Sequence, residues 1–235
     1  MHSFTHHHKR PDKQPSPSRR GAIITFSAWR YDLIVRWFVM HGKEREFRGK
    51  IADLAQLQSG EAVLDVGCGT GTQALAAKKR VGEAGRVCGI DPSVSLLAGA
   101  RRKAARAGLA IDFRVGGIER IAFPDQSFDA VLSTFMFHHL PDDLKRQGLA
   151  EVARVLKADG RLLVVDFKHS EAPQSQPEQF GAGALGLQEL PALMKEAGFS
   201  QVETGEIPFH IRSLAAGHQH YGYVLARKSM AEARI

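Results

Sequence analysis

The sequence predicts an α/β fold: a seven-stranded, mostly parallel sheet with helices on both faces and an antiparallel terminal strand. From Ala62 onward, short runs rich in β-branched residues alternate with longer stretches whose apolar residues recur at helical spacing. This alternation is typical of βαβ units, which build a parallel sheet. Two strand-like runs later in the sequence, without the helical spacing between them, supply a terminal strand pair.

Each strand candidate is a short, largely apolar run. In order, the candidates are residues 62–66, 86–90, 110–115, 128–134, 161–167, 201–207 and 221–228. Helices are predicted over residues 70–81, 93–107, 142–156 and 187–197. In the third helix, Leu144, Leu149, Val152 and Leu156 recur at the helical period and form one apolar face.

The residues before the sheet are predicted to form two distinct parts. Residues 1–20 hold five Lys or Arg, a run of three His and almost no apolar side chains, which is typical of a disordered basic tail. Residues 21–58 are helical in pattern and carry Trp29, Tyr31 and Trp37, so we expect a helical lid that packs on the rest of the chain. Residues 59–235 are then expected to form one ligand-binding domain.

Charge and composition exclude several classes of protein. The formal net charge is +7, but the basic tail carries more than half of it, so the body offers no basic face for nucleic acid. No apolar run approaches the roughly 20 residues of a membrane span, and no secretory signal is visible, which predicts a cytoplasmic protein. The basic tail and the Trp-rich helix leave a peripheral membrane contact open. Cys68 and Cys88 have no metal-ligand spacing, so we expect neither a metal site nor a disulfide.

The stretch VLDVGCGTG, residues 63–71, runs from a strand into a glycine-rich turn. In a parallel sheet, ligands bind beyond the carboxyl ends of the strands, where the first strand meets its helix. A dinucleotide-binding fingerprint would require a third glycine at position 72, which is Thr72. Asp65, inside the strand, would be poorly placed beside a pyrophosphate but well placed for an ammonium-bearing ligand. The turn therefore argues against a dinucleotide.

Asp91 ends the second strand candidate, 20 residues after Gly71. A carboxylate at this point accepts hydrogen bonds from the two hydroxyls of an unphosphorylated ribose. The alternative is a purely structural role, in which Asp91 caps the next helix and Pro92 takes its first position. The spacing from the glycine turn favours the ribose role.

Five blocks in series resemble the class I S-adenosylmethionine-dependent methyltransferases, in the broad group of the ubiquinone and menaquinone C-methyltransferases. The blocks are VLDVGCGTG, GIDPS, ERIAFPDQSFDAVLS, FHHLPD and EVARVLKADGRLLVVDF, and they follow one another across residues 60–167. The resemblance implies a Rossmann-like fold, S-adenosylmethionine as the cofactor and methyl transfer as the reaction.

The resemblance also implies which residues hold each part of the cofactor. The methionine part would lie against the glycine turn and under Thr134, the ribose against Asp91, and the adenine near Gly117. At position 117 the family usually has an acidic or amide side chain for the adenine amino group, which this chain lacks. The adenine is therefore expected to be held by the Ile118 backbone and apolar packing, with Asp112 and Glu119 as the acidic candidates. The lid is expected to fold over the cofactor. The residues implied are Asp65, Gly67, Gly69, Thr70, Asp91, Gly117, Ile118, Thr134 and Tyr31.

Transfer of a methyl group from a sulfonium needs mainly alignment, and positioning alone can contribute about 7–11 kcal/mol. A base is required only when the acceptor loses a proton. His138 and His139, after the fourth strand, are the catalytic candidates. The alternative is that one of them packs at a helix start while the other is exposed.

Aromatic side chains in residues 29–38 and 135–137 indicate a small-molecule acceptor that is apolar or lipid-like. The alternatives are a methyltransferase for membrane phospholipids or quinones, and a cofactor-binding protein of this fold without catalysis.

Overall fold

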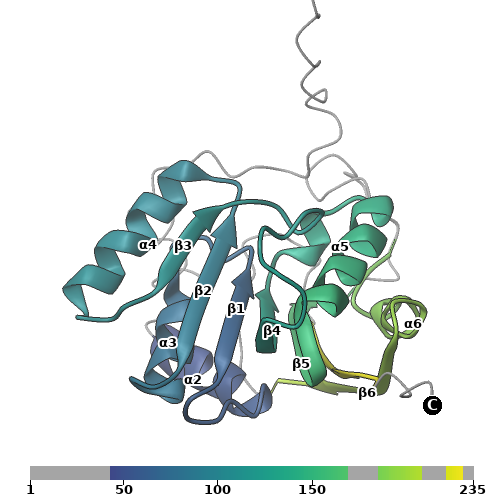
Figure 1. Cartoon of the computed structure of the whole chain (residues 1–235). Helices are drawn as coiled ribbons and strands as arrows, with labels where there is room; N and C mark the ends of the chain where they lie inside the picture. Colours follow the sequence, from purple (N-terminus) through teal and green to yellow (C-terminus); the bar gives the residue numbers. More distant parts are fainter. Residues whose placement is uncertain (1–42, 169–184, 208–220, 230–235) are drawn as a thin grey trace, which may run out of the picture.

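The computed structural model describes residues 43–168, 185–207 and 221–229 (Figure 1). The basic tail, Tyr31 and most of the predicted lid lie outside these residues. The strands are β1 (Ala62–Val66), β2 (Arg86–Asp91), β3 (Asp112–Val115), β4 (Phe128–Thr134), β5 (Leu156–Phe167), β6 (Phe199–Glu206) and β7 (Tyr221–Lys228). The helices are α2 (Glu44–Leu54), α3 (Thr72–Val81), α4 (Val94–Arg106), the short 3-10 helix η3 (Phe137–His139), α5 (Asp142–Val155) and α6 (Leu190–Glu196).

The strands form one seven-stranded sheet in the order β3-β2-β1-β4-β5-β7-β6. The pairs among β1 to β5 are parallel, and β7 runs antiparallel to both β5 and β6. The predicted α/β class, strand number and antiparallel ending are confirmed. Because the chain leaves β1 toward β2 on one side and later returns to β4 on the other, the carboxyl end of β1 is the topological switch point.

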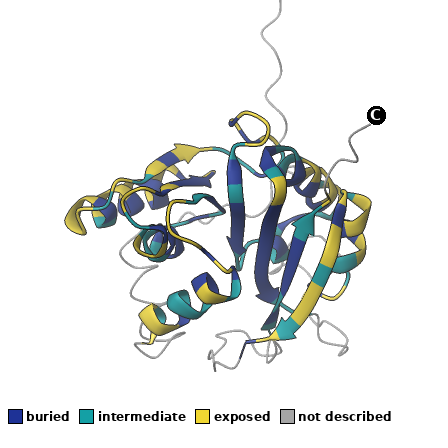
Figure 2. Cartoon of the chain, turned by 60° about the horizontal axis from the view of Figure 1, so that its bottom comes forward, coloured by how far each residue is buried: buried dark blue, intermediate teal, exposed yellow. Residues whose placement is uncertain are grey.

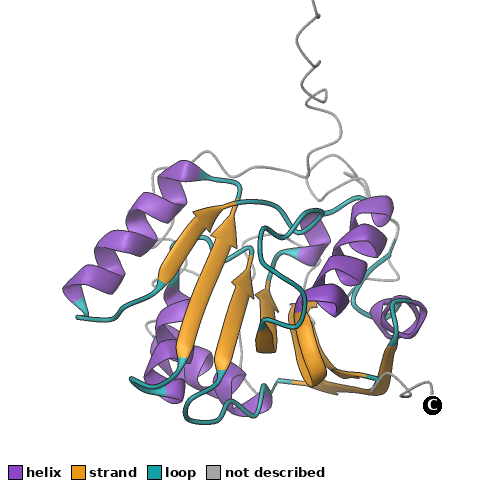
Figure 3. Cartoon of the chain, in the orientation of Figure 1, coloured by secondary structure: helices purple, strands orange, loops and turns teal. Residues whose placement is uncertain are grey.

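Two helical layers cover the two faces of the sheet (Figure 3). Strand side chains alternate between them, as the period of two requires: Leu162 and Val164 belong to the core cluster that contains α5 and α6, whereas Leu163 and Val165 belong to the cluster that contains α2, α3 and α4. The central strands are almost wholly buried and the edge strand β6 is largely exposed (Figure 2).

Element boundaries differ from the predicted ones at two informative places. Helix α3 begins at Thr72, two residues after the predicted start, because Gly71 is in the left-handed region at φ 76° and cannot continue a helix. Strand β5 begins at Leu156 rather than at 161, since Leu156 already pairs with Phe128 before an irregularity shifts the register to Arg161 opposite Ala130.

Helix α2 is the described part of the predicted helical segment. Its buried residues Phe47, Ile51 and Ala52 pack into the same core cluster as α3 and α4. This packing fixes α2 on the domain and leaves Arg48, the neighbour of Phe47, with a side chain that is 12% exposed. Within the described ranges, no helix is both long and apolar enough to cross a lipid bilayer.

Candidate functional site

The glycine turn is held against β2 by its own backbone. The Gly67 and Cys68 N–H groups both donate to the Ile90 carbonyl, at 2.9 and 3.0 Å. Gly67, Gly69 and Gly71 have φ values of 71°, 52° and 76°, a region that side chains disfavour. A Cβ at Gly71 would lie within 2.9 Å of side chains on β3 and α4, whereas one at Gly69 would meet nothing within 4 Å. Gly71 therefore serves packing, and Gly69 leaves room for a ligand.

Asp65, beneath this turn, is a fully buried carboxylate that lacks a hydrogen-bond partner in the part of the chain that the structure describes. Its exposed fraction is 0%, and neither carboxylate oxygen has a hydrogen bond to any described residue. Burial raises its pKa to about 7, although the charge of Arg48 and the nearby Ala74 N–H oppose this rise. A buried carboxylate in this state is costly unless a donor pairs with it. The site therefore fits a ligand that brings positively charged N–H groups, as the amino-acid end of S-adenosylmethionine does.

Asp91 accepts two backbone hydrogen bonds at the end of β2. Its Oδ2 accepts from the Gly69 N–H at 2.9 Å and its Oδ1 from the Ser93 N–H at 2.8 Å. The N-cap of α4 is Ser93, whose Oγ accepts from the Leu96 N–H, so the alternative of Asp91 as the cap is wrong. Burial raises the pKa of Asp91, and the two N–H donors limit that rise. Each carboxylate oxygen keeps a second lone pair, so the ribose role stays a prediction.

The two predicted threonines lie on different sides of the glycine turn. The Thr70 Oγ1 accepts from the Lys103 ammonium at 2.8 Å, which directs this hydroxyl toward α4. The Thr134 Oγ1 accepts from Arg48 Nη1 at 3.2 Å. Thr134 ends β4, which pairs with β1. It therefore lies on the strand beside Asp65, at the end predicted for methionine.

Glu119 occupies the space that a side chain at position 117 would need. A Cβ built on Gly117 would lie within 2.6 Å of both Glu119 carboxylate oxygens. Ile118 is 3% exposed and belongs to the core. Asp112, the other acidic candidate, is exposed and pairs with Arg114 at 2.8 Å. Of the two acidic side chains, Glu119 is therefore the one beside the predicted adenine position.

His138 is held by a buried carboxylate that the sequence interpretation missed. Asp166, near the end of β5, is 1% exposed, and its Oδ1 lies 2.7 Å from His138 Nδ1. The same carboxylate accepts from the His138 N–H at 3.2 Å and from the Phe167 N–H at 2.8 Å. A carboxylate only accepts, so Nδ1 carries the proton and Nε2 is the basic nitrogen. This is the arrangement of an oriented general base.

His139 is in a different state. Its ring lies against that of His138, tilted by 43° with centroids 3.8 Å apart, and its buried Nδ1 has no partner among the described residues. Burial, followed by the charge of His138, lowers the pKa of His139 to about 4, against the opposing effect of Asp166. His139 is therefore neutral and weakly basic at physiological pH. Of the two predicted histidines, the geometry favours His138 as the base.

An aromatic cluster lies beside His138, formed by Phe47, Phe135, Phe167 and Tyr221. The Phe135 ring lies 5.0 Å from Phe167, 6.0 Å from Phe47 and 6.1 Å from Tyr221. Phe135 has a φ of 54°, and such strained positions gather at functional sites. The Tyr221 hydroxyl is buried without a partner in the described part of the chain, and burial raises its pKa to about 12.

Only part of the predicted apolar pocket belongs to this cluster. Phe135 is a member, whereas Phe137 is 2% exposed and lies in the core. Met136 packs over Gly67. The aromatic residues predicted from 29 to 38 lie outside the described residues.

Arg48 and Asp166 were not among the predicted site residues. Asp166 had a usable signal, because it is a lone acidic residue near the end of an apolar strand, as Asp65 is. Arg48 had none, because its position depends on how α2 packs.

Comparisons with known proteins point to one family. Residues 63–160 match a family described as a methyltransferase domain. The demethylmenaquinone methyltransferase of Deinococcus radiodurans is 38% identical over 156 residues, which are 66% of this chain and 63% of that protein. The ubiquinone/menaquinone biosynthesis C-methyltransferase of Xanthomonas oryzae is 33% identical over 159 residues, or 67% of this chain and 62% of that protein. The chain thus spans less than two thirds of the length of these relatives.

Solved structures agree on the fold. A SAM-dependent methyltransferase from Aquifex aeolicus superposes with a TM-score of 0.65 at 24% identity, covering 86% of this chain and 99% of that one. A phosphoethanolamine N-methyltransferase from Haemonchus contortus has a TM-score of 0.70 at 19% identity, over 86% of this chain and 57% of that one. The sequence matches and the shared Rossmann-like fold lead to one conclusion: residues 63–160 form a domain of the class I S-adenosylmethionine-dependent methyltransferases, and the chain is similar to the ubiquinone/menaquinone C-methyltransferases.

Proposed function

We propose that this chain transfers a methyl group from S-adenosylmethionine to a small or lipid-like apolar acceptor that loses a proton in the reaction. The observation that carries the proposal is Asp65, a fully buried carboxylate without a hydrogen-bond partner among the described residues, at the switch point of the sheet. A ligand with an ammonium group would supply both the charge and the donors that this carboxylate lacks.

The surrounding residues support a complete cofactor site. S-adenosylmethionine, when bound, supplies a methyl group on a sulfonium sulfur that becomes a neutral thioether. Asp91 holds the ribose hydroxyls with the lone pairs that its two backbone hydrogen bonds leave unused. Gly69 gives the backbone close access to the ligand. Glu119 takes the adenine amino group in place of the side chain that Gly117 lacks.

His138 acts on the acceptor. Its Nε2 takes the proton that the acceptor loses, and the buried Asp166 carboxylate stabilises the imidazolium that forms. Alignment by the site accounts for most of the rate, and this proton transfer adds about 10²- to 10⁴-fold. The pair also speaks against a protein that binds the cofactor without catalysis, because an oriented base has no use there.

The acceptor lies against the aromatic cluster. Phe167 contacts the His138 ring edge to face, with centroids 5.1 Å apart, so a flat apolar molecule that stacks there has its ionisable group beside the base. The curated relatives are named for demethylmenaquinone and ubiquinone or menaquinone methylation. A reduced quinone-type ring, which is apolar and carries an ionisable hydroxyl, is therefore the first acceptor to test.

Two measurements test the proposal. Calorimetric titration of the full chain with S-adenosylhomocysteine is expected to give saturable binding, and the absence of binding would overturn the cofactor assignment. Incubation with methyl-labelled S-adenosylmethionine and reduced naphthoquinones, phenols, amines and phosphatidylethanolamine vesicles is then expected to label the hydroxyl-bearing aromatic compounds first. Labelling of the vesicles alone would identify a phospholipid acceptor instead.

A further inference from the structure

Arg48 is a cation that the proposed function does not yet use. Its guanidinium reaches from α2 to β4, where Nη1 donates to Thr134 Oγ1 at 3.2 Å. Nη2 is 3.5 Å from Glu44, an i,i+4 contact that is long for a salt bridge. The side chain is 12% exposed, and its buried Nε has no partner within the described residues. The guanidinium is therefore well placed but incompletely satisfied.

The charge of Arg48 acts directly on Asp65, since it is the largest influence that lowers the pKa of this carboxyl. Even so, no hydrogen bond joins the two side chains, and both keep unpartnered atoms. Gln73 is the third member of the group: it is 2% exposed, its Nε2 donates to the Arg48 carbonyl, and its Oε1 is buried without a described partner. The Ala74 N–H, which follows Gln73, is the backbone donor that influences Asp65.

These three side chains have unpaired hydrogen-bonding atoms of complementary kinds. Asp65 and Gln73 present acceptor oxygens that need N–H donors, and Arg48 presents N–H donors that need an anionic acceptor. An ammonium group alone would satisfy the first two and leave the Arg48 Nε unpaired. A carboxylate alone would leave Asp65 unpaired. A zwitterion that carries both groups on one carbon atom, as an α-amino acid does, satisfies all of them.

We propose that Arg48 binds the α-carboxylate of the cofactor's amino-acid end, while Asp65 and the Gln73 Oε1 hold its ammonium group. Thr134, which is hydrogen-bonded to Arg48 Nη1, keeps the guanidinium at the carboxyl end of β4. The inference rests on the proposed function, because it assigns a residue to one end of the same cofactor. It makes α2 a part of the cofactor site, although α2 precedes all the strands.

The test separates the two ends of the ligand by calorimetric titration. S-adenosylhomocysteine carries both the ammonium and the carboxylate, and its decarboxylated analogue, 5′-(3-aminopropylthio)-5′-deoxyadenosine, carries only the ammonium. We expect the wild-type chain to prefer the first ligand by about 10- to 100-fold, the range for a charge-assisted hydrogen-bonded pair. Arg48→Met is expected to bring the two affinities close together by weakening only S-adenosylhomocysteine.

Three further variants make the result specific. Arg45→Met removes a guanidinium from the exposed side of the same helix and is expected to leave the preference intact. Asp65→Asn is expected to weaken both ligands in parallel, because both carry the ammonium group. Arg48→Lys keeps a charge but loses the planar fork, so the preference is expected to fall several-fold. If Arg48→Met fails to fold, as judged by circular dichroism, Arg48→Lys decides the question alone.

The outcomes separate this inference from the function on which it rests. A wild-type preference that Arg48→Met and Arg48→Lys leave unchanged would overturn the role of Arg48 while the cofactor assignment stands. Failure of the wild-type chain to bind either ligand would overturn both.

Discussion

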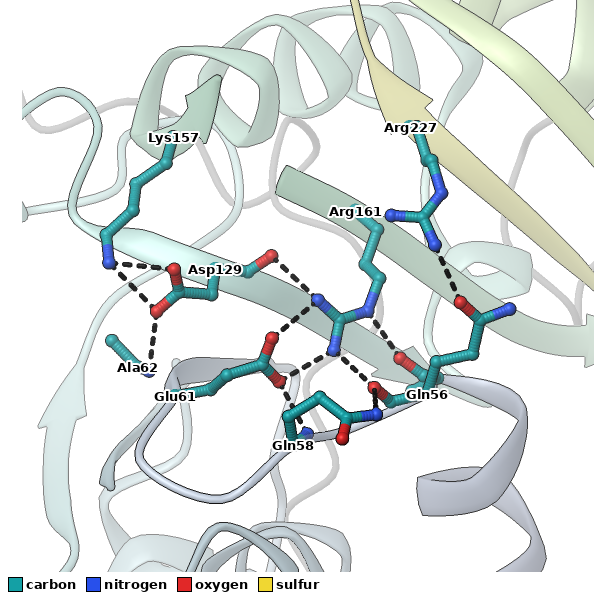
Figure 4. Close-up of polar contacts among 9 residues, drawn as sticks. Gln56, Gln58, Glu61, Ala62, Asp129, Lys157, Arg161 and Arg227 are labelled. Carbon is teal, nitrogen blue, oxygen red and sulfur yellow. Dashed lines mark hydrogen bonds and ion pairs between the residues drawn. The ribbon is translucent and has the colours of Figure 1, made fainter. Parts of the chain in front are cut away.

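The two ends of the central strands, here called the amino edge and the carboxyl edge, both hold buried polar residues. Within the described residues, these have hydrogen-bond partners at the amino edge, whereas several at the carboxyl edge lack them. At the amino edge, where β1 and β4 begin, the buried Arg161 guanidinium has all five of its N–H groups in hydrogen bonds (Figure 4). Two go to the Glu61 carboxylate at 2.7 and 2.8 Å, and the others go to the carbonyls of Ala55, Gln56 and Asp129. Nearby, Lys157 contacts both Asp129 carboxylate oxygens at 2.8 and 2.9 Å. Both cations at this edge therefore have their partners within the described residues.

At the carboxyl edge, where β1, β2, β4 and β5 end, buried polar atoms lack partners. In the described part of the chain, they belong to Arg48, Asp65, Gln73, Ser133, His139 and Tyr221. Each of these residues lies in or beside a strand end at this edge, in η3, or in a helix packed against it. Native proteins rarely leave such groups unpaired. Within the described residues, folding alone thus satisfies the polar groups at the amino edge, whereas at the carboxyl edge the proposed cofactor and acceptor would supply the missing partners.

The largest effect is expected on turnover, from a change at His138 near the carboxyl edge. His138→Gln removes the oriented base, so turnover is expected to fall by about 10²- to 10⁴-fold. Titration with S-adenosylhomocysteine should show unchanged affinity. His139→Gln is the matched control, and an equal loss of turnover there would contradict the choice of His138.

At the amino edge, the effect is expected on stability alone. Arg161→Met leaves the half-buried Glu61 carboxylate with only the Gln58 N–H as a donor and removes the guanidinium from three backbone carbonyls, so the free energy of unfolding should fall by about 3–5 kcal/mol. Urea denaturation checks this value, and cofactor affinity of the folded protein should not change. Arg227→Met, which removes a single contact to the Gln56 side chain, is expected to cost less than about 1 kcal/mol. A loss of cofactor affinity in Arg161→Met would break the division between the edges.

Replacement of Asp65 is expected to raise the free energy of unfolding, whereas Arg161→Met lowers it. The unfolded chain releases this proton near pH 3.8, whereas the folded chain holds it to about pH 7. Between these values the unfolded state binds fewer protons, so the free energy of unfolding falls as pH rises, by up to about 4 kcal/mol. Asp65→Asn removes this dependence and is expected to stabilise the ligand-free protein at pH 8 by about 2–4 kcal/mol, while weakening cofactor binding.

Urea denaturation from pH 4 to pH 8 measures the effect of Asp65→Asn. Asp112→Asn, at an exposed carboxylate, serves as the control and should not reproduce the flattening. A less stable Asp65→Asn protein at pH 8 would show that the buried carboxylate is already satisfied without a ligand.

The smallest effect is expected at the adenine end. Gly117→Asp alone places a side chain where the Glu119 carboxylate lies, and Glu119→Ala alone removes that carboxylate. Each is expected to weaken S-adenosylhomocysteine by about 10-fold, the value of one hydrogen bond to a charged group. The double variant should recover most of the affinity, since the new Asp side chain takes the vacated space. If the losses of binding free energy in the two single variants simply add in the double variant, the Asp side chain at position 117 does not replace Glu119.

Much of the carboxyl edge could be predicted from the sequence because its signals are local. The glycine turn, Asp65 and Asp91 lie in strands that the hydrophobic pattern delimits, and the order of parallel strands brings their ends together. Partners that are distant in sequence were not predictable. Arg48 meets Thr134 across 86 residues and His138 meets Asp166 across 28, and only packing determines which side chains touch. The hydrogen bonds of Arg161 at the amino edge could not be predicted for the same reason.

Arg161 also affects the order in which contacts form while the chain is synthesised and folds. It is separated by 106 residues from Ala55 and by 100 from Glu61, the groups that it joins to β5. During synthesis, the hydrogen bonds from Arg161 to the connection between α2 and β1 therefore form only after β5 has left the ribosome and docked beside β4. Such distant contacts close late and slowly. Helix α2 can pack against α3 and α4 before then, and Arg161 adds the last hydrogen bonds to the segment that joins α2 to β1.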